Sequence, residues 1–206
     1  MNSRKLAFDL GANIGQKVRE LLGAGYNKVI AVEPLHDNPF PNNPKVVWIK
    51  SLVSSDTEPR EIYPAGTVST VERDFMQGRF KGYTWEAPVI CPCTTITKLV
   101  DAYGVPDYIK IDVEGHEIQV LQGLPDPCPI PSLSFEWCSE FKTIALGCVS
   151  HLEGLGYKQF ALQLEDKGVE SPQLWYNAVE LASQLDEACN RDHYAWGQIW
   201  ANLTLT

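Results

Sequence analysis

The sequence contains no run of lysine and arginine residues, and its 26 acidic residues outnumber its 17 basic ones, which makes the formal net charge −9. A protein that binds duplex nucleic acid needs a basic surface to neutralise the phosphates. The composition therefore argues against a duplex nucleic-acid partner, although it leaves a compact substrate open.

Long apolar runs are also missing, because no stretch reaches the roughly 20 residues that a helix needs to cross a bilayer. The first apolar residues, Leu6 to Phe8, already belong to a strand pattern, and no signal peptide precedes them. We therefore expect a protein without a transmembrane segment, located in the cytoplasm. The sequence leaves open whether the chain forms a homo-oligomer.

The six cysteines include no C-x-x-C pair, the spacing that zinc sites and redox motifs commonly use. The closest spacing is Cys91-Pro92-Cys93, where proline fixes an extended backbone that makes a poor chelate. We expect reduced and mostly buried thiols, as in a cytosolic protein, rather than disulfides or bound zinc.

What the chain does contain is an alternation of apolar strand patterns with amphipathic helix patterns, which is typical of a parallel, doubly wound α/β sheet. At 206 residues and 44% apolar content, it is long enough for a single domain, residues 1–206, with a full core. Strands are expected at 5–10, 28–32, 45–49, 107–113, 132–137, 156–162 and 194–203, and helices at 14–24, 95–103, 141–155 and 174–189, with a further helix starting near 114.

Two segments depart from this alternation. Residues 36–44 contain three prolines, so the crossover between two strands should hold one short turn of helix at most. Residues 59–93 are irregular, with short strand patterns near both ends. We interpret them as an insertion or as an element on the side where the substrate binds.

The first strand leads into Asp9-Leu10-Gly11-Ala12-Asn13-Ile14-Gly15, which reads as strand, tight turn and helix. Glycine at positions 11 and 15 permits a sharp turn and a close approach to the backbone, which a Cβ would block. About twenty residues later, Glu33 ends the second strand, where a carboxylate can accept both ribose hydroxyls of a nucleoside. The turn therefore predicts a nucleoside-containing ligand.

Three classes of ligand use this geometry. A dinucleotide site wants G-x-G-x-x-G, but here Asn13 stands in the middle and no third glycine follows in register. The phosphate-binding sequence G-x-x-x-x-G-K-[ST] is absent. An acidic residue before the turn, Asp9, suits a cationic ligand, and S-adenosylmethionine offers a sulfonium, an ammonium and a ribose without phosphate.

Four motifs fall at the predicted carboxyl ends of strands, where ligands of doubly wound sheets bind: Asp9–Gly15, Glu33-Pro34, Asp112–Glu117 and Glu136-Trp137. Their agreement on one edge of the sheet is stronger support for a site than any single motif. We expect the functional site at this edge.

Several blocks of the chain, in this order and spacing, resemble the FkbM family of S-adenosylmethionine-dependent methyltransferases. The resemblance covers roughly residues 6–137, and its most specific part is Tyr108-Ile109-Lys110-Ile111-Asp112-Val113-Glu114-Gly115-His116-Glu117. The other matching blocks are 8–15, Val32-Glu33-Pro34, Ser69-Thr70 and 93–99.

This resemblance implies a Rossmann-like, mostly parallel seven-stranded sheet whose last strand is antiparallel, and O-methyl transfer, often to a sugar or polyketide hydroxyl. Carried over by position, it implies cofactor contacts from three groups of residues. Asp9, Gly11, Asn13 and Gly15 would line the methionine part, Glu33 and Pro34 the ribose, and Ser54 and Ser55 the adenine. Asp112 resembles the family's acidic residue beside the sulfonium.

Methyl transfer to an alcohol also requires a group that removes the hydroxyl proton. His116, just after a strand end, is the first candidate base, and Glu136 and Asp112 are further catalytic candidates. Lys110 and Asp112 share a strand face, so we expect a buried lysine–carboxylate pair. Two carboxylates without a clear third ligand do not favour a metal site.

Two other functions stay open at this point. One is a cofactor-binding partner protein without catalytic activity, and the other is an NAD(P)-dependent oxidoreductase, against which the missing third glycine argues.

Overall fold

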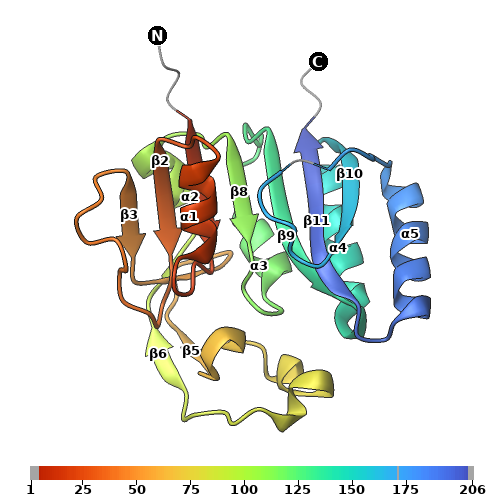
Figure 1. Cartoon of the computed structure of the whole chain (residues 1–206), viewed down its shortest axis with the longest axis horizontal. Helices are drawn as coiled ribbons and strands as arrows, with labels where there is room; N and C mark the ends of the chain where they lie inside the picture. Colours follow the sequence, from red (N-terminus) through yellow and green to blue (C-terminus); the bar gives the residue numbers. More distant parts are fainter. Residues whose placement is uncertain (1–4, 171, 204–206) are drawn as a thin grey trace.

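The computed structural model describes residues 5–170 and 172–203. A seven-stranded sheet in the order β10-β11-β9-β8-β1-β2-β3 forms its centre (Figure 1). The strands are β1 (Leu6–Leu10), β2 (Lys28–Val32), β3 (Val46–Ile49), β8 (Tyr108–Ile111), β9 (Ser132–Cys138), β10 (Tyr157–Leu164) and β11 (Trp196–Leu203). The last strand, β11, is antiparallel to both β9 and β10, while the pairs from β9 to β3 are parallel. The predicted fold class is confirmed.

The described helices cover both faces of the sheet. Helix α1 (Gln16–Gly23) packs Val18 and Leu21 into one apolar cluster, while the remaining α-helices contribute to the cluster on the opposite face. These are α2 (Ile96–Tyr103), α3 (Glu117–Leu121), α4 (Lys142–Gly154) and α5 (Ala178–Arg191). None of the described helices is long and apolar enough to span a membrane.

The residues of β1 show why the sheet forms here. All five are buried, and alternate side chains enter the two apolar clusters: Leu6, Phe8 and Leu10 face one, and Ala7 faces the other. A strand covered on both faces is expected to be an almost continuous apolar run. The exception, Asp9, lies at the carboxyl end of the strand and is fully buried, which places a carboxyl group directly beneath the predicted site.

The proline-rich connection between β2 and β3 contains no helix among its described residues, in agreement with the prediction. Its Phe40 packs on the glycine turn, so close that a Cβ added at Gly15 would lie 2.5 Å from the ring. The connection therefore supports the turn after β1 directly, in place of the crossover helix that usually joins parallel strands.

The irregular segment 59–93 projects beyond the carboxyl ends of the parallel strands (Figure 1). It contains β5 (Arg60–Ile62) paired antiparallel with β6 (Val89–Cys91), and three short 3-10 helices at Gly66–Val68, Arg73–Met76 and Gly78–Gly82. At its boundary, β4 (Leu52–Val53) pairs with β7 (Cys93–Thr94).

A small aromatic cluster of its own holds this segment against the main sheet. The ring of Phe75 stacks on Phe80 at 4.5 Å and on Phe141 at 5.1 Å between centroids. Phe141 lies immediately before α4, so the stack joins the projecting segment to the helical layer. Five of the six cysteines are buried, in line with the expected burial, and Cys189 is half-buried.

Candidate functional site

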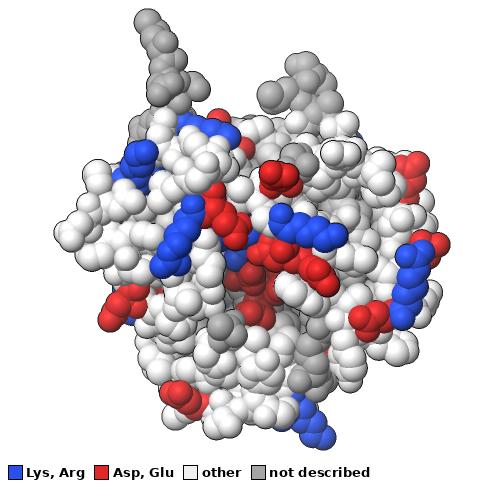
Figure 2. Space-filling view, in the orientation of Figure 1, with Lys and Arg blue, Asp and Glu red and all other residues white. Residues whose placement is uncertain are grey.

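A cavity of about 270 Å³ opens at the carboxyl edge of the sheet, where the predicted motifs meet. Its wall includes the glycine turn (Gly11, Ala12, Asn13), the end of β2 (Glu33, Pro34), residues 51–53 and the turn after β8 (Asp112, Glu114, His116). Figure 2, in the orientation of Figure 1, shows acidic side chains gathered in and around a hollow near the middle of the view. The strand order reverses between β1 and β8, which is the position where doubly wound sheets bind ligands.

The two glycines of the turn are required mainly by contacts within the protein. Gly11 and Gly15 have φ angles of 82° and 80°, a region that other residues occupy only with strain. A Cβ at Gly11 would lie 1.7 Å from the carbonyl oxygen of Asp112. Gly15 packs against Phe40 and does not line the cavity. Gly11 lines the cavity, as expected of a residue that admits a ligand close to the backbone, whereas the structure brings Gly15 against Phe40 instead.

Asn13 and Asp9 contain buried polar atoms that find no partner within the described chain. The Oδ1 atom of Asn13, a residue of the cavity wall, accepts no hydrogen bond there. Neither carboxyl oxygen of Asp9 is hydrogen-bonded within the same residues, and the Lys110 Nζ atom is 3.8 Å away. Because Asp9 lies behind the cavity wall, the structure does not place it where the resemblance implies cofactor contact.

The predicted buried pair between Lys110 and Asp112 is confirmed. The Nζ atom of Lys110 lies 2.8 Å from the Asp112 carboxylate, and the lysine side chain is 6% exposed. Burial lowers the pKa of Lys110, but the carboxylates of Asp112 and Asp9 outweigh it and leave the pKa raised. The lysine therefore stays charged and fixes the orientation of Asp112 at the cavity wall.

Glu33 ties the end of β2 to the glycine turn. One carboxylate oxygen accepts the backbone N–H groups of Leu35 at 2.7 Å and His36 at 3.1 Å. The other oxygen accepts the N–H of Asn13 at 3.0 Å and has no further partner among the described residues. A carboxylate oxygen can accept more than one hydrogen bond, so this second oxygen can still receive a ligand hydroxyl.

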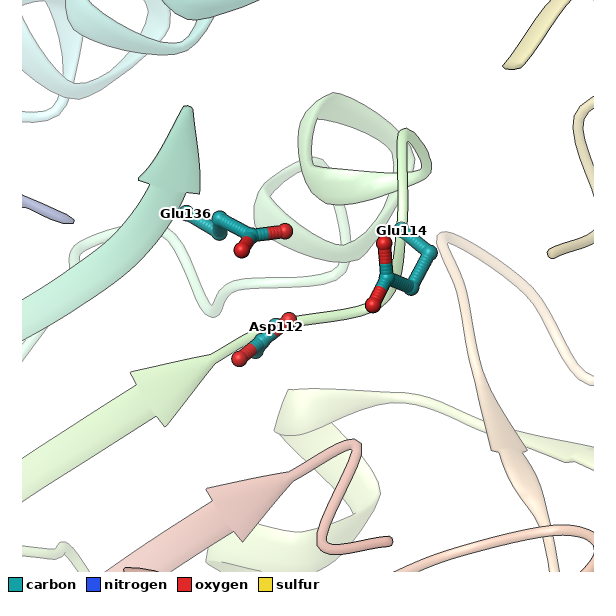
Figure 3. A group of neighbouring side chains, drawn as sticks. All are labelled: Asp112, Glu114 and Glu136. Atoms are coloured by element: carbon teal, nitrogen blue, oxygen red, sulfur yellow. The ribbon is translucent and has the colours of Figure 1, made fainter. Parts of the chain in front are cut away.

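Three carboxylates converge beside this wall, as Figure 3 shows. Oxygen atoms of Asp112, Glu114 and Glu136 lie within 4.8 Å of one another. Burial raises the pKa of Glu136 well above its usual range, and the charges of Asp112 and Glu114 raise it further. Glu114 precedes α3 and belongs to this group. The backbone of Glu114 has a φ of 55° at this turn. Nothing in the sequence indicated this left-handed conformation.

Glu117 supports the turn that carries two of these carboxylates. Its side chain is buried and accepts the backbone N–H groups of Val113 and Gly115, both at 3.2 Å. Burial raises the pKa of Glu117 to about 7. The arrangement gives Glu117 a structural role, as a support for the turn.

His116 lines the cavity, but both of its ring nitrogens already have protein partners. Nε2 lies 3.0 Å from the Ser54 hydroxyl, and Nδ1 lies 2.6 Å from the Glu72 carboxylate.

Ser54 is fully buried behind the wall and Ser55 is exposed to solvent, so neither lines the cavity. The wall on that side is formed by residues 51–53, which directly precede the two serines.

A family model described as the methyltransferase FkbM domain matches residues 9–143. The chain belongs to the FkbM methyltransferase family. The match includes the glycine turn, Glu33 and Asp112 of the wall, together with the neighbouring Glu136, so most of the cavity wall of this FkbM methyltransferase lies inside the matched region. No curated protein matches the chain.

Several solved structures are similar to this FkbM methyltransferase over almost its whole length. A precorrin-6y C5,15-methyltransferase from Geobacter metallireducens GS-15 has 11% identity and a TM-score of 0.45, over 98% of this chain and 80% of that one. A putative hemolysin from Streptococcus thermophilus has 10% identity and a TM-score of 0.46, over 98% and 60%. A mutant of the 16S rRNA (adenine(1408)-N(1))-methyltransferase from Catenulisporales acidiphilia has 11% identity and a TM-score of 0.41, over 97% and 84%.

Two charged residues of the FkbM methyltransferase cavity were not predicted from the sequence. Lys17, in the first turn of α1, and Asp166, in the loop after β10, both line the cavity and form an ion pair at 2.8 Å. Asp166 lies outside the family match. A polar loop without periodicity gives no signal that it folds back to α1, so only the structure brings these residues together.

Proposed function

We propose that this FkbM methyltransferase uses S-adenosylmethionine to methylate a hydroxyl group of a small molecule or a sugar. The observation that carries the proposal is Glu33, which ends β2 at the cavity wall and has one carboxylate oxygen with a single donor among the described residues. That oxygen is suited to a ribose hydroxyl.

The other residues of the cavity also fit this cofactor. The Oδ1 atom of Asn13, unpartnered within the described chain, is an acceptor for a cationic N–H donor. The carboxylates of Asp112 and Glu114 give the neighbouring wall a negative charge, which suits a sulfonium. When bound, S-adenosylmethionine would supply an electrophilic methyl group on that sulfonium. Glu33 would hold the ribose, Asn13 the methionine part, and residues 51–53 the adenine.

The chain's own residues must orient the acceptor hydroxyl and take its proton. We place the proton acceptor at Glu136, because its carboxylate has no hydrogen-bond partner among the described residues while both nitrogens of His116 are occupied. A raised pKa makes a carboxylate a stronger base. Asp112, held by Lys110, would lie beside it.

We assign residues 59–93 to the acceptor side. Ile62, Gly66, Ser69 and Val71 line the cavity from this segment. Its position is held by the Thr70 hydroxyl, which donates to the carbonyl oxygen of Glu114 at 2.6 Å. The contact between Glu72 and His116 supports the same attachment. We therefore infer that His116, besides lining the cavity, helps to position this segment.

Isothermal titration of the purified protein with S-adenosylhomocysteine tests the cofactor assignment. We expect binding by the wild type and weaker binding by Glu33→Ala, on the order of 10-fold, because a hydrogen bond to a charged group contributes roughly 1.5–3 kcal/mol. Asp37→Ala, which removes a fully exposed carboxylate, is the matched control. Absence of binding by the wild type would contradict the proposal.

Mass spectrometry of methylated products, after incubation with S-adenosylmethionine and a panel of polyols, monosaccharides and amines, tests the acceptor class. Methylation of a hydroxyl is the expected outcome. Methylation confined to amines would contradict the assignment of O-methyl transfer.

A further inference from the structure

Lys17 and Asp166 form an ion pair in the cavity wall. Asp166 lies outside the region that the family model matches. The Lys17 ammonium lies 2.8 Å from Oδ1 of Asp166 and 2.7 Å from the Glu20 carboxylate. The Lys17 side chain is 7% exposed, whereas that of Glu20 is 43% exposed. A lysine that is nearly buried at the wall of a ligand cavity, on the first turn after the glycine loop, is placed to contact a ligand.

The donors and acceptors of this pair are not exhausted. An ammonium group has three donors, and the partners of Lys17 in the described chain account for two of them. Oδ1 of Asp166 accepts from Lys17 and from the Gly168 backbone at 3.0 Å, while Oδ2 has no partner in the same part of the chain. The pair therefore offers one cationic donor and one anionic oxygen, side by side.

The second lysine of the described cavity wall is differently placed. Lys110 lies between Asp112 at 2.8 Å and the buried Asp9 at 3.8 Å. Asp112 belongs to the group of three carboxylates, so a ligand carboxylate near Lys110 would also meet these negative charges. Lys17 is the lysine of the described wall that lies outside that group.

We propose that Lys17 and Asp166 bind the amino-acid end of the cofactor, with the Lys17 ammonium donating to its carboxylate and Asp166 Oδ2 accepting from its ammonium. The inference rests on the proposed S-adenosylmethionine dependence. An adjacent cation and anion match a zwitterion of the opposite arrangement, because each ligand charge meets an opposite protein charge. This extends the cofactor site beyond the family match to the loop after β10.

The structure holds Asp166 in place before any ligand binds. The connection from β10 to α5 passes on the α1 side of the sheet (Figure 1). Val169 and Trp175 of this connection pack against the apolar cluster that includes Val18 and Leu21 of α1. Tyr176 pairs with Phe160 of β10. A prepositioned carboxylate loses little conformational entropy on binding.

The test compares two ligands that share the adenosine part. S-adenosylhomocysteine carries the amino-acid end, and 5′-methylthioadenosine lacks it. Dissociation constants for both are measured by isothermal titration with the wild type, Lys17→Met, Asp166→Asn and Lys142→Met. Lys142 is the matched control, because it forms an ion pair with Asp186 at the same 2.8 Å but does not line the cavity.

We expect Lys17→Met and Asp166→Asn each to weaken S-adenosylhomocysteine binding by about 10- to 100-fold, the loss of a charged hydrogen bond. Binding of 5′-methylthioadenosine should stay at the wild-type level in both variants, and Lys142→Met should bind both ligands normally. Equal weakening of both ligands would assign the pair a structural role and overturn the proposal, as would unchanged binding of S-adenosylhomocysteine. If the wild type binds 5′-methylthioadenosine but not S-adenosylhomocysteine, this proposal fails; if it binds neither ligand, the cofactor assignment fails with it.

Discussion

Asp9 offers a direct measurement of what burial of a charge costs in this fold. Burial raises the pKa of Asp9 from the 3.8 of an ordinary aspartate to about 6, although Lys110 acts against this. At about 1.4 kcal/mol for each pH unit, the ionised carboxylate makes the folded state about 3 kcal/mol less stable than the neutral form would. Asp9→Asn removes the ionisation and keeps the shape of the side chain.

The direction of the effect follows from the raised pKa. Below pH 3.8 the carboxyl is protonated in both the folded and the unfolded chain, so its titration does not affect stability. Between pH 3.8 and about 6 the unfolded chain releases the proton first, and the free energy of unfolding of the wild type falls as the pH rises. The difference between Asp9→Asn and the wild type should therefore grow in favour of the variant by about 3 kcal/mol between about pH 4 and about pH 7.

Urea unfolding, followed by tryptophan fluorescence at several pH values, measures this difference. A difference in the free energy of unfolding that is the same at every pH does not affect the test, because only the change of this offset with pH is compared. Asp37→Asn is the control, since the Asp37 side chain is fully exposed, and its offset should not change. If the offset of Asp9→Asn is also flat across this pH range, the assignment of Asp9 as a buried, ionising carboxyl is refuted.

Three further predictions concern the turn, the proposed proton acceptor and the projecting segment. Gly11→Ala forces a Cβ into the Asp112 carbonyl at a φ of 82°, so we expect a loss of stability of at least about 2 kcal/mol in thermal unfolding; an unchanged midpoint would contradict this. Glu136→Gln should lower the methylation rate by about 100-fold or more without weakening S-adenosylhomocysteine binding, and a wild-type rate would remove Glu136 from the mechanism. Phe75→Ala deletes the ring that stacks on two neighbouring aromatic residues and should cost the segment about 3–5 kcal/mol of local stability. Hydrogen exchange should then accelerate at residues 60–85, whereas equal acceleration in β1 and β8 would show that the segment does not open separately.

The sheet was predictable because its strands carry simple patterns. Strands β1, β2 and β8 are nearly continuous apolar runs, and a run of that kind fits a strand that is covered on both faces. Helix α2 was predictable from its cap, since the Thr95 side chain accepts the N–H of Lys98 as expected of an N-cap residue. The carboxyl ends of parallel strands share one edge, which is why the position of the cavity followed from the order of the motifs.

The inner details of the site depend on contacts between distant residues, which no local pattern encodes. The sequence could show that Gly11 is a turn residue, but not that the Asp112 carbonyl is what excludes a side chain there. Likewise, His116 could be placed at a strand end, but its partners Ser54 and Glu72 come from 62 and 44 residues away. The side chains were therefore predicted at the carboxyl edge of the sheet, where the structure has them, while their hydrogen-bond partners were not predicted.

The loop that carries Asp166 also has a consequence for how the protein is made. The glycine turn, β2 and the turn after β8 all precede α4 in the chain, whereas β10, which leads into the loop, is joined to the rest of the sheet through β11, the last strand. During synthesis, the wall of the cavity is therefore completed from the C-terminal part of the chain, after most of its other parts have left the ribosome. A nascent chain that ends before residue 166 lacks Asp166 and therefore cannot form the Lys17–Asp166 pair.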